Sequence, residues 1–394
     1  MLDSIAIAET GLQGYETALK TISNNTANMN TPGFKGSSTE FSDLAFGNAG
    51  GGQDGGDASF GHPGLGLETL GTSIDFSQGE LQSTSNPLDL AVNGNGFFMT
   101  RDTQGNVHYT KDGQFKFDAE GALVSSTTGE HVLAMDGGGA LSPISIAGLN
   151  TNLPKTTTKI TFSGNLSTTA TTDTINSVTV IDAAGTSHSL QVTLTPVAGA
   201  AGSWTVTLLD GAATVGTSTL KFTGNVVTPG SGTLSFNYTP AGGTAMPLTL
   251  DFSANVTSSD TGGTSSLAVA SQDGYASGTL TGETFDSTGT LVLTYSNNQT
   301  VKEQQLALAQ FSSVDQVEAV GNSEFKAKGD AWRTGVAGSA NFGSIASSEI
   351  EGSNVDLSRE FSNLVIMQRG YQASSQIVST ASDMLTALFG MMPK

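Results

Sequence analysis

The sequence of 394 residues contains no cysteine, which excludes disulfides, thiolate metal sites and cysteine nucleophiles together. Charged residues are also scarce, at 13% of the chain. Basic residues are the rarer sign, because 15 Lys and Arg stand against 35 Asp and Glu, a net charge of −20. A negative field of this size repels phosphate backbones and anionic lipid headgroups. We therefore expect no nucleic-acid partner.

Residues typical of catalytic and metal sites are few. The four histidines, His62, His108, His131 and His188, show none of the short spacings of zinc ligands. There is no G-x-S-x-G nucleophile elbow, and no Gly-Lys pair for a phosphate-binding loop. No neighbouring sequence argues that acidic pairs such as Glu349 and Glu351 are buried, so we expect them on a solvated face. The sequence predicts no enzyme, no catalytic residue, no metal and no cofactor.

Long apolar runs are missing as well. No stretch approaches the ~18 uncharged apolar residues that span a bilayer, so we expect no membrane insertion. Residues 1–13 include Asp3 and Glu9 and have no basic region and no A-x-A cleavage site. The protein is therefore expected either to stay in the cytosol or to leave the cell without a cleaved signal peptide.

Both ends of the chain show the spacing of amphipathic helices. In the N-terminal 30 residues, apolar side chains recur at intervals of three and four: Ile5, Ala8, Leu12, Tyr15, Leu19 and Ile22. The C-terminal end has two heptad positions, one with Leu357, Leu364, Tyr371, Val378 and Leu385, the other with Met367, Ala381 and Leu388 and the polar Glu360 and Ser374. We expect the first helix to end before Thr31, and Asn354 or Asp356 to cap the second.

The middle of the chain alternates with period two. Apolar and polar residues alternate in five short segments, 178–181, 190–194, 204–208, 234–238 and 248–252. Four D-x-x-G motifs, beginning at Asp102, Asp118, Asp182 and Asp286, predict turns between strands. The fold class predicted is mainly β with α-helical termini.

Composition divides this middle further. Between Ile160 and Val301 the only basic residue is Lys221, which predicts an inserted β-domain that folds independently. Residues 48–56 and the Ser/Gly-rich residues 339–352 are expected to be flexible linkers.

The apolar positions of the two helices predict self-assembly. Full burial of an apolar side chain contributes ~1.5–3 kcal/mol, whereas ordering the backbone costs ~1–2 kcal/mol per residue, so an isolated pair of helices has no surplus. We expect the helices to become ordered when neighbouring copies bury them, and the alternative is a private two-helix hairpin within one chain. The candidate self-assembly residues are Ile5, Leu12, Tyr15, Leu19, Ile22, Leu357, Leu364, Met367, Tyr371, Val378, Leu385 and Leu388.

Several segments resemble one known family. Residues 27–35, ANMNTPGFK, contain the motif residues Asn28, Asn30, Thr31, Gly33, Phe34 and Lys35. Further segments are NPLDLAVNGNGFF at 86–98, YTKDGQF at 109–115, EGSNVDL at 351–357 and QRGYQASSQIV at 368–378. Together they are similar, in the same order along the chain, to segments of the flagellar rod and hook axial proteins. Residues 145–270 resemble the insertion that hook-type members carry and rod-type members lack. Phe41 and Ala45 resemble an export-gate signal, for which a local packing turn is the alternative.

The resemblance implies a discontinuous multi-domain axial protein. Its parts would be a coiled-coil-like inner polymerisation domain (1–30 plus 355–394), a connecting segment (31–70 plus 325–354), an inner β-domain (71–144 plus 271–324) and an outer β-domain (145–270). It also implies a structural subunit of the extracellular flagellar hook, a flexible helical tube that transmits torque from rod to filament as a universal joint. The implied partners are further copies of the chain, rod and hook-filament junction proteins, the hook cap and the flagellar type III export apparatus. A distal rod protein and a secreted β-rich adhesin are the alternatives.

Overall fold

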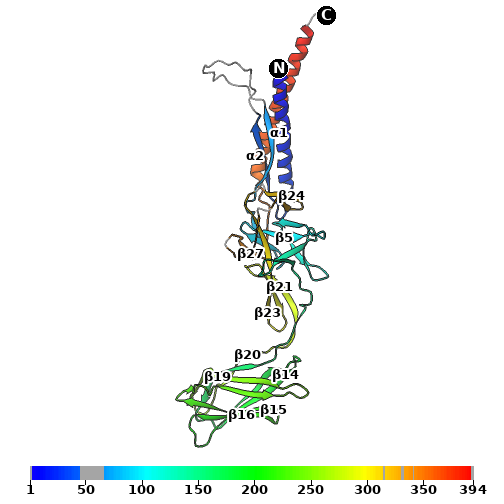
Figure 1. Ribbon diagram of the computed structural model, residues 1–394. Coiled ribbons are helices and arrows are strands. Elements are labelled where there is room, and N and C mark those ends of the chain that lie inside the picture. The colour runs from blue at the N-terminus through cyan, green and yellow to red at the C-terminus, as the bar shows by residue number, and fades with distance from the viewer. Residues whose placement is uncertain (1, 45–65, 314–315, 330–331, 340, 392–394) are drawn as a thin grey trace, which may run out of the picture. The chain divides into compact units, whose positions relative to one another are not determined.

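The computed structural model describes residues 2–44, 66–313, 316–329, 332–339 and 341–391 (Figure 1). The chain is mainly β, with one long helix near each end, which confirms the fold class expected from the sequence. It divides into two compact units: unit 1 comprises residues 1–147, 283–292 and 302–394, and unit 2 comprises residues 148–282 and 293–301. Three strands contribute residues to both units: β21 (Gly278–Phe285), β22 (Thr290–Tyr295) and β23 (Thr300–Phe311). The four-part domain boundaries given above stay a prediction.

Unit 1 contains both helices, α1 (Leu2–Ala27) and α2 (Leu357–Met391). As expected, α1 ends before Thr31. Asp356 caps α2, because its Oδ1 accepts hydrogen bonds from the backbone N–H groups of Ser358 (2.8 Å) and Arg359 (3.3 Å). The other predicted cap residue, Asn354, instead binds the chain after α1: its Oδ1 accepts the N–H of Gly36 at 2.8 Å.

The strands of unit 1 belong to several sheets, the largest of which carries a small apolar core. They are β1 (Ser37–Asp43), β2 (Leu67–Ile74), β3 (Leu81–Ser83), β4 (Leu90–Asn93), β5 (Phe97–Arg101), β6 (Val107–Thr110), β7 (Phe115–Phe117), β8 (Leu123–Ser125), β9 (His131–Met135), β10 (Leu141–Pro143), β24 (Val317–Gly321), β25 (Glu324–Ala327), β26 (Trp332–Val336), β27 (Ser344–Ser347) and β28 (Glu349–Glu351). Strand β5 pairs with β6, β9 and the 308–309 segment of β23, and β6 pairs with β25. Phe97, Met99, Tyr109 and Phe325 fill the core beside them.

The expectation of a flexible linker over residues 339–352 is wrong for residues 344–347 and 349–351. β27 pairs antiparallel with β4, and β28 pairs antiparallel with β3. The sequence did not indicate these strands, because their side chains show no alternation of apolar and polar residues. Strand pairing depends on backbone hydrogen bonds, which form without that alternation. The other expected linker, residues 48–56, lies outside the described residues.

Unit 2 is built on a nine-stranded sheet. Its strands are β11 (Thr151–Asn152), which pairs with β21, and β12 (Lys159–Ser167), β13 (Asp173–Ile181), β14 (Ser187–Pro196), β15 (Ser203–Asp210), β16 (Ala213–Thr223), β17 (Val226–Val227), β18 (Thr233–Tyr238), β19 (Met246–Ser259) and β20 (Ala268–Gln272), which form the sheet. β12 and β19 run parallel, and the other pairs of the sheet are antiparallel. All five segments with period two lie in these strands, so that prediction is confirmed.

The D-x-x-G motifs form the predicted turns. In each, the glycine N–H donates to the carbonyl of the aspartate, as in Gly185 to Asp182 at 3.0 Å and Gly289 to Asp286 at 2.8 Å. The aspartate Oδ1 accepts backbone N–H groups two and four residues later, at Ala184 and Thr186 for Asp182. Gly185 has φ of +85°, a conformation that glycine adopts without strain.

Candidate assembly surface and junction of the signature segments

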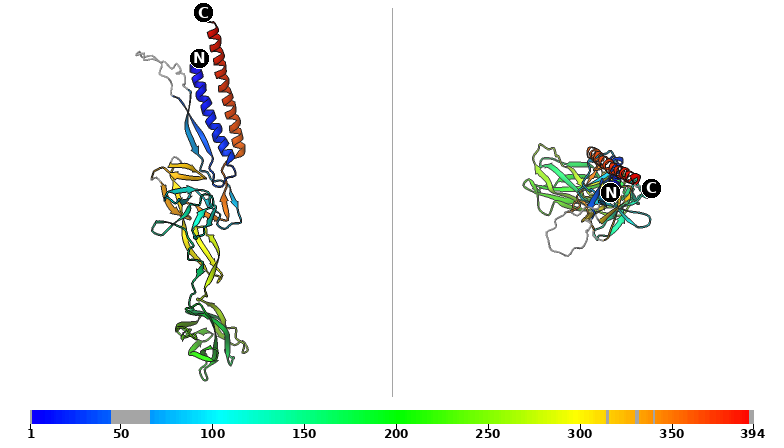
Figure 2. Two further views of the ribbon diagram at one scale, coloured as in Figure 1. Left: turned by 90° about the vertical axis from the view of Figure 1, so that its right-hand side faces the viewer. Right: turned by 90° about the horizontal axis from the view of Figure 1, so that it is seen from above.

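The two helices form an antiparallel pair within one chain (Figure 2). Tyr15 packs on Gly370, where an added Cβ would lie 2.6 Å from the ring, and a Cβ on Gly11 would lie 3.0 Å from the Ser374 Oγ. Asn25 donates through Nδ2 to the Glu360 Oε1 at 3.2 Å. Residues further along α1 thus contact residues correspondingly earlier in α2, which is the register of an antiparallel pair. At this register, the last residues of α2, from about Leu385, extend beyond the start of α1 (Figure 2).

The predicted self-assembly residues lie mostly at or beside this intrachain contact. In α1, Ile22 is buried, and Ile5, Leu12, Tyr15 and Leu19 are half-buried. In α2, Leu357, Leu364, Met367, Val378 and Leu385 are half-buried, whereas Tyr371 and Leu388 are exposed. This is the arrangement of the private hairpin named above as the alternative. Contact of these residues with another copy stays a prediction.

A second apolar surface lies on α2, and of its four residues the heptad analysis had included only Leu388. Ile366, Ile377, Met384 and Leu388, here called the outer strip, are separated by eleven, seven and four residues, close to whole helical turns. Their exposures are 60%, 50%, 54% and 50%. Part of the strip lines a groove of about 590 Å³ together with Ser4, Ala373, Gln376, Thr380 and Ala381. The strip has the spacing and exposure of a helix face that another helix can cover.

The signature motif after α1 forms a tight turn against β28. Asn28 accepts the Thr31 hydroxyl at 3.2 Å, and the Phe34 N–H donates to the Thr31 carbonyl at 3.2 Å. Gly33 has φ of +66°, and its N–H donates to the Glu351 carbonyl at 2.8 Å. A Cβ on Gly33 would lie 2.4 Å from the backbone N of Asp112, so this position requires glycine. Asn30 is exposed and Phe34 is half-buried.

Three signature segments meet in a buried ion cluster, formed by Lys35, Lys111 and Glu351. Lys35 Nζ pairs with Glu351 Oε1, and Lys111 Nζ lies 3.6 Å from Glu351 Oε2. The side chains of Lys35 and Glu351 are fully buried, and that of Lys111 is 2% exposed. Burial lowers the pKa of Lys111 to about 8, against the opposing attraction of Glu351.

The expectation that Glu351 lies on a solvated face is therefore wrong. Its partners Lys35 and Lys111 are 316 and 240 positions away in the sequence. No local pattern could indicate that pairing. Both lysines and Glu351 do stand inside the segments that carry the family resemblance, and this was the available signal.

Of the two residues of the expected export signal, only Phe41 lies among the described residues. Phe41 lies in β1 and is half-buried, and a Cβ added to Gly14 of α1 would lie 3.2 Å from its ring. This placement fits the packing alternative. Ala45 lies outside the described residues, and a role in export stays a prediction.

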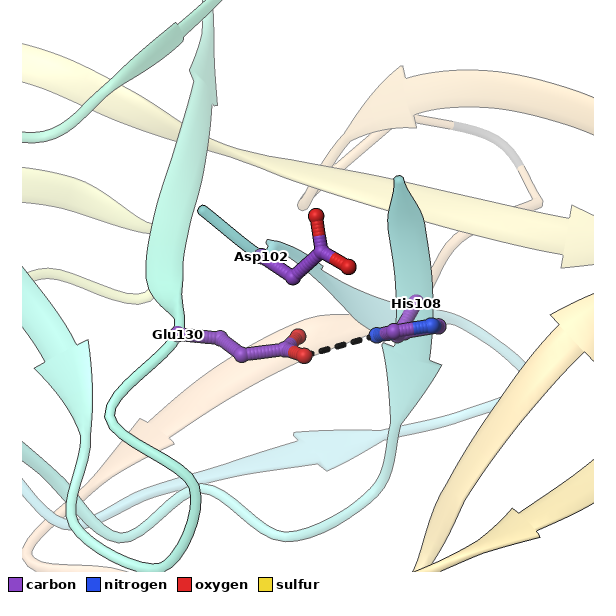
Figure 3. A group of neighbouring side chains, drawn as sticks. All are labelled: Asp102, His108 and Glu130. Carbon is purple, nitrogen blue, oxygen red and sulfur yellow. Dashed lines mark hydrogen bonds and ion pairs between the residues drawn. The ribbon is translucent and has the colours of Figure 1, made fainter. Parts of the chain in front are cut away.

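One group of side chains has the donor types of a metal site: Asp102, His108 and Glu130 (Figure 3). The His108 Nδ1 lies 2.7 Å from the Glu130 Oε1, and Thr100 donates its hydroxyl to the Glu130 Oε2 at 2.8 Å. Asp102 accepts hydrogen bonds from its own turn, including the N–H of Asn106 at 2.8 Å. Both carboxylates already have hydrogen-bond partners within the chain, so the geometry is that of a hydrogen-bonded cluster. The histidine spacing could not find it, because its members come from a turn, a strand and a loop.

Comparison with known proteins connects this fold to the flagellum. Three family models match: "Flagella basal body rod protein" over residues 5–35, "Flagellar hook protein FlgE/F/G D1 domain" over 91–168, and "Flagellar basal body rod FlgEFG protein C-terminal" over 346–391. Together with the paired helices and the β-sheets, these matches place the chain in the class of flagellar axial proteins.

Individual relatives narrow this class. The flagellar hook protein FlgE of Salmonella typhimurium is 32% identical over 420 residues, covering 98% of this chain and 100% of that protein. The flagellar basal-body rod protein FlgG of Buchnera aphidicola is 37% identical over 134 residues, covering 32% of this chain and 50% of that protein. A solved Helicobacter pylori flagellar hook protein FlgE2 has a TM-score of 0.47 and 14% identity, over 62% of this chain and 93% of that chain. The chain belongs to the flagellar hook protein family.

The search for membrane spans gives one further observation. Among the described residues, neither helix combines the length and the apolar character that crossing a bilayer requires.

Proposed function

We propose that this chain polymerises into the flagellar hook through its helix pair, with the outer strip as the contact to a neighbouring copy. The observation that carries this proposal is the outer strip itself, four half-exposed apolar residues in line on α2 beside the groove. Covering them would remove about half of each side chain from water, or roughly 1 kcal/mol per residue. A contact between two different surfaces repeats without closing when the rotation allows, which generates an open helical polymer.

The polymer would work as a torque-transmitting universal joint. Densely packed apolar helices resist twisting, because relative motion must break many contacts at once. Polar, wet contacts between β-units can slide as the tube bends. The low charge of residues 160–301, where Lys221 is the only basic residue, supports such sliding.

Export and partners are part of the same proposal. The chain would leave the cell unfolded through the flagellar type III apparatus without a cleaved signal peptide, and assemble outside it beneath the hook cap. Rod and hook-filament junction proteins would contact the two ends of the tube, and no catalytic role is proposed. A distal rod role is not favoured, because the rod relative above covers only 32% of the chain, whereas the hook relative covers 98%.

The test is assembly of the purified full-length chain, observed by electron microscopy and sedimentation. We expect the wild type to form tubes and Ile377→Asp/Met384→Asp to stay monomeric, because a charge buried without a partner costs several kcal/mol. Gln372→Asp, on another side of α2, is the matched control and should assemble. Tubes from the double variant would remove the outer strip from the interface.

A further inference from the structure

The segment between α1 and β1 and the segment from the last residue of β28 to α2 connect the helix pair to the strands of unit 1, here called the β-part. One side chain holds both of these segments, here called the crossings. The outgoing crossing contains Lys35, eight residues after the end of α1, and the returning crossing contains Glu351, six residues before α2. The Glu351 carboxylate pairs with Lys35 through Oε1, and the same oxygen accepts the Gly79 N–H at 2.9 Å. The Lys35 Nζ also donates to the Ser77 carbonyl at 2.7 Å. The loop between β2 and β3 is thereby tied to both crossings.

Lys111 ties the same carboxylate to the core of the β-part. Its Nζ donates to the Gly94 carbonyl at 2.7 Å and lies 5.3 Å from the centre of the Phe97 ring. Phe97 belongs to the core beside β5. One buried carboxylate therefore contacts Lys35 in the segment after α1, the loop after β2, and Lys111 directly after β6.

The charges of the cluster are unequal. When both lysines are protonated, two ammonium groups face one carboxylate, and the Glu351 Oε2 has no hydrogen-bond partner among the described residues. Removing one partner of a buried ion pair leaves an uncompensated charge, which is far more costly than removing the whole pair. Loss of Glu351 would leave two buried cations, whereas loss of Lys111 would leave a balanced pair.

We infer that Glu351 is a positioning residue that clamps both crossings, so that twist of the helix pair passes directly to the β-part of unit 1. This inference rests on the proposed function for the twist, but the clamp itself is a property of one copy. The clamp predicts that the crossings open locally when Glu351 is neutralised, while the core strands of unit 1 remain closed.

Hydrogen exchange of the full-length monomer tests the clamp. In Glu351→Gln we expect the opening of residues 20–36 and 351–363 to rise at least about 100-fold, because two buried ammonium groups lose their counter-charge. The strands β5 and β9 should change several-fold at most. An equal rise across unit 1 would mean global destabilisation and would overturn the clamp, as would unchanged exchange at the crossings.

Lys111→Met is the second variant, and it keeps the protein foldable because a one-to-one ion pair remains. Charged groups facing Lys111 are Glu351 on β28 and Lys35 after α1. The pKa of Lys111 is about 8 in the folded chain and near its ordinary 10.5 when unfolded, so the unfolded chain holds more protons between these values. The stability of unit 1 should therefore rise from about pH 8 to pH 10.5.

In Lys111→Met this rise should be absent. Denaturation followed by Trp332 fluorescence in a Trp204→Phe background reports unit 1 alone, since the chain has only two tryptophans. A rise of equal size in Lys111→Met would contradict the assignment. Failure of the wild type to form tubes would leave the clamp intact and remove only the proposed function.

Discussion

The sheet of unit 2 and the helix pair of unit 1 bury their apolar residues to very different degrees. Along β14, Leu190, Val192 and Leu194 are all essentially inaccessible, and the polar residues between them face outward. Among the described side chains of α2, Ala381 is the only apolar one that is buried, with 7% of its surface exposed. Strand alternation completes a core inside unit 2, whereas the helix pair leaves large apolar side chains of α2, such as Phe361 and Ile366, exposed. Folding of one chain buries the apolar residues of the sheet completely. In the helix pair, apolar side chains remain exposed, and association with another copy can bury them.

The largest effect should come from breaking the completed core. Phe162 and Phe252 are inaccessible and stack at 4.4 Å between ring centres. Phe252→Ala should lower the free energy of unfolding of unit 2 by about 3–5 kcal/mol, because a cavity replaces the ring. Trp204 fluorescence during denaturation in a Trp332→Phe background measures this, and exposed Thr219→Ala should stay within about 0.5 kcal/mol of the wild type. Loss of helical circular dichroism in Phe252→Ala under native conditions would show that the two regions do not fold independently.

A smaller effect should separate the inner contact of the helices from their outer surface. Leu364 is half-buried, and its neighbour Val365 is 45% exposed. Leu364→Asp should destabilise the helix pair by about 1–3 kcal/mol, since the carboxylate loses water in the contact. Val365→Asp should leave the pair intact. Thermal unfolding followed by circular dichroism at about 222 nm, which reports helix content, compares the two variants. An equal loss of stability in both would remove the distinction between inner and outer faces.

The smallest effect concerns an ion pair of unit 2. The Lys159 ammonium lies 2.7 Å from the Asp251 Oδ2 and, with Ser253, lowers the pKa of Asp251 to about 2 from its ordinary 3.8. A depressed carboxyl pKa gives stability that is present above pH 3.8 and is lost as the pH falls through about 2. Lys159 is half exposed, so we expect the pair to contribute below about 1 kcal/mol. In Lys159→Met, the free energy of unfolding of unit 2 should fall less between pH 3.8 and about 2 than in the wild type. In Lys221→Met this dependence on pH should be unchanged.

Local patterns were enough for the elements of the fold. The alternation at 190–194 and the three-and-four spacing from Ile5 to Ile22 predicted a strand and a helix that the structure contains. The aspartate turns were predictable because their hydrogen bonds stay within five residues. A fifth such turn, Asp136 to Gly139, escaped because it was hidden in a glycine run.

Contacts between distant residues were beyond local patterns. Glu351 looked solvated beside Glu349, and only the folded chain brings Lys35 and Lys111 to it. Ile366, Ile377 and Met384 of the outer strip escaped for another reason. A heptad analysis selects the face that meets one partner, and α2 carries a second apolar line next to that face, which shares only Leu388 with the heptad positions. The sequence could indicate that the helices associate, but not which surface of each helix is covered by the contact within one copy.

The antiparallel register of the helices has a practical consequence for imaging this protein. Because α1 begins where α2 is close to its end, a fluorescent protein fused ahead of α1 or behind α2 would crowd the same tip of the helix pair (Figure 1). The turn at Gly199, where a Cβ would meet no heavy atom within 4 Å, offers open space in unit 2 for a short labelling peptide. A dye attached there would leave both helical faces bare.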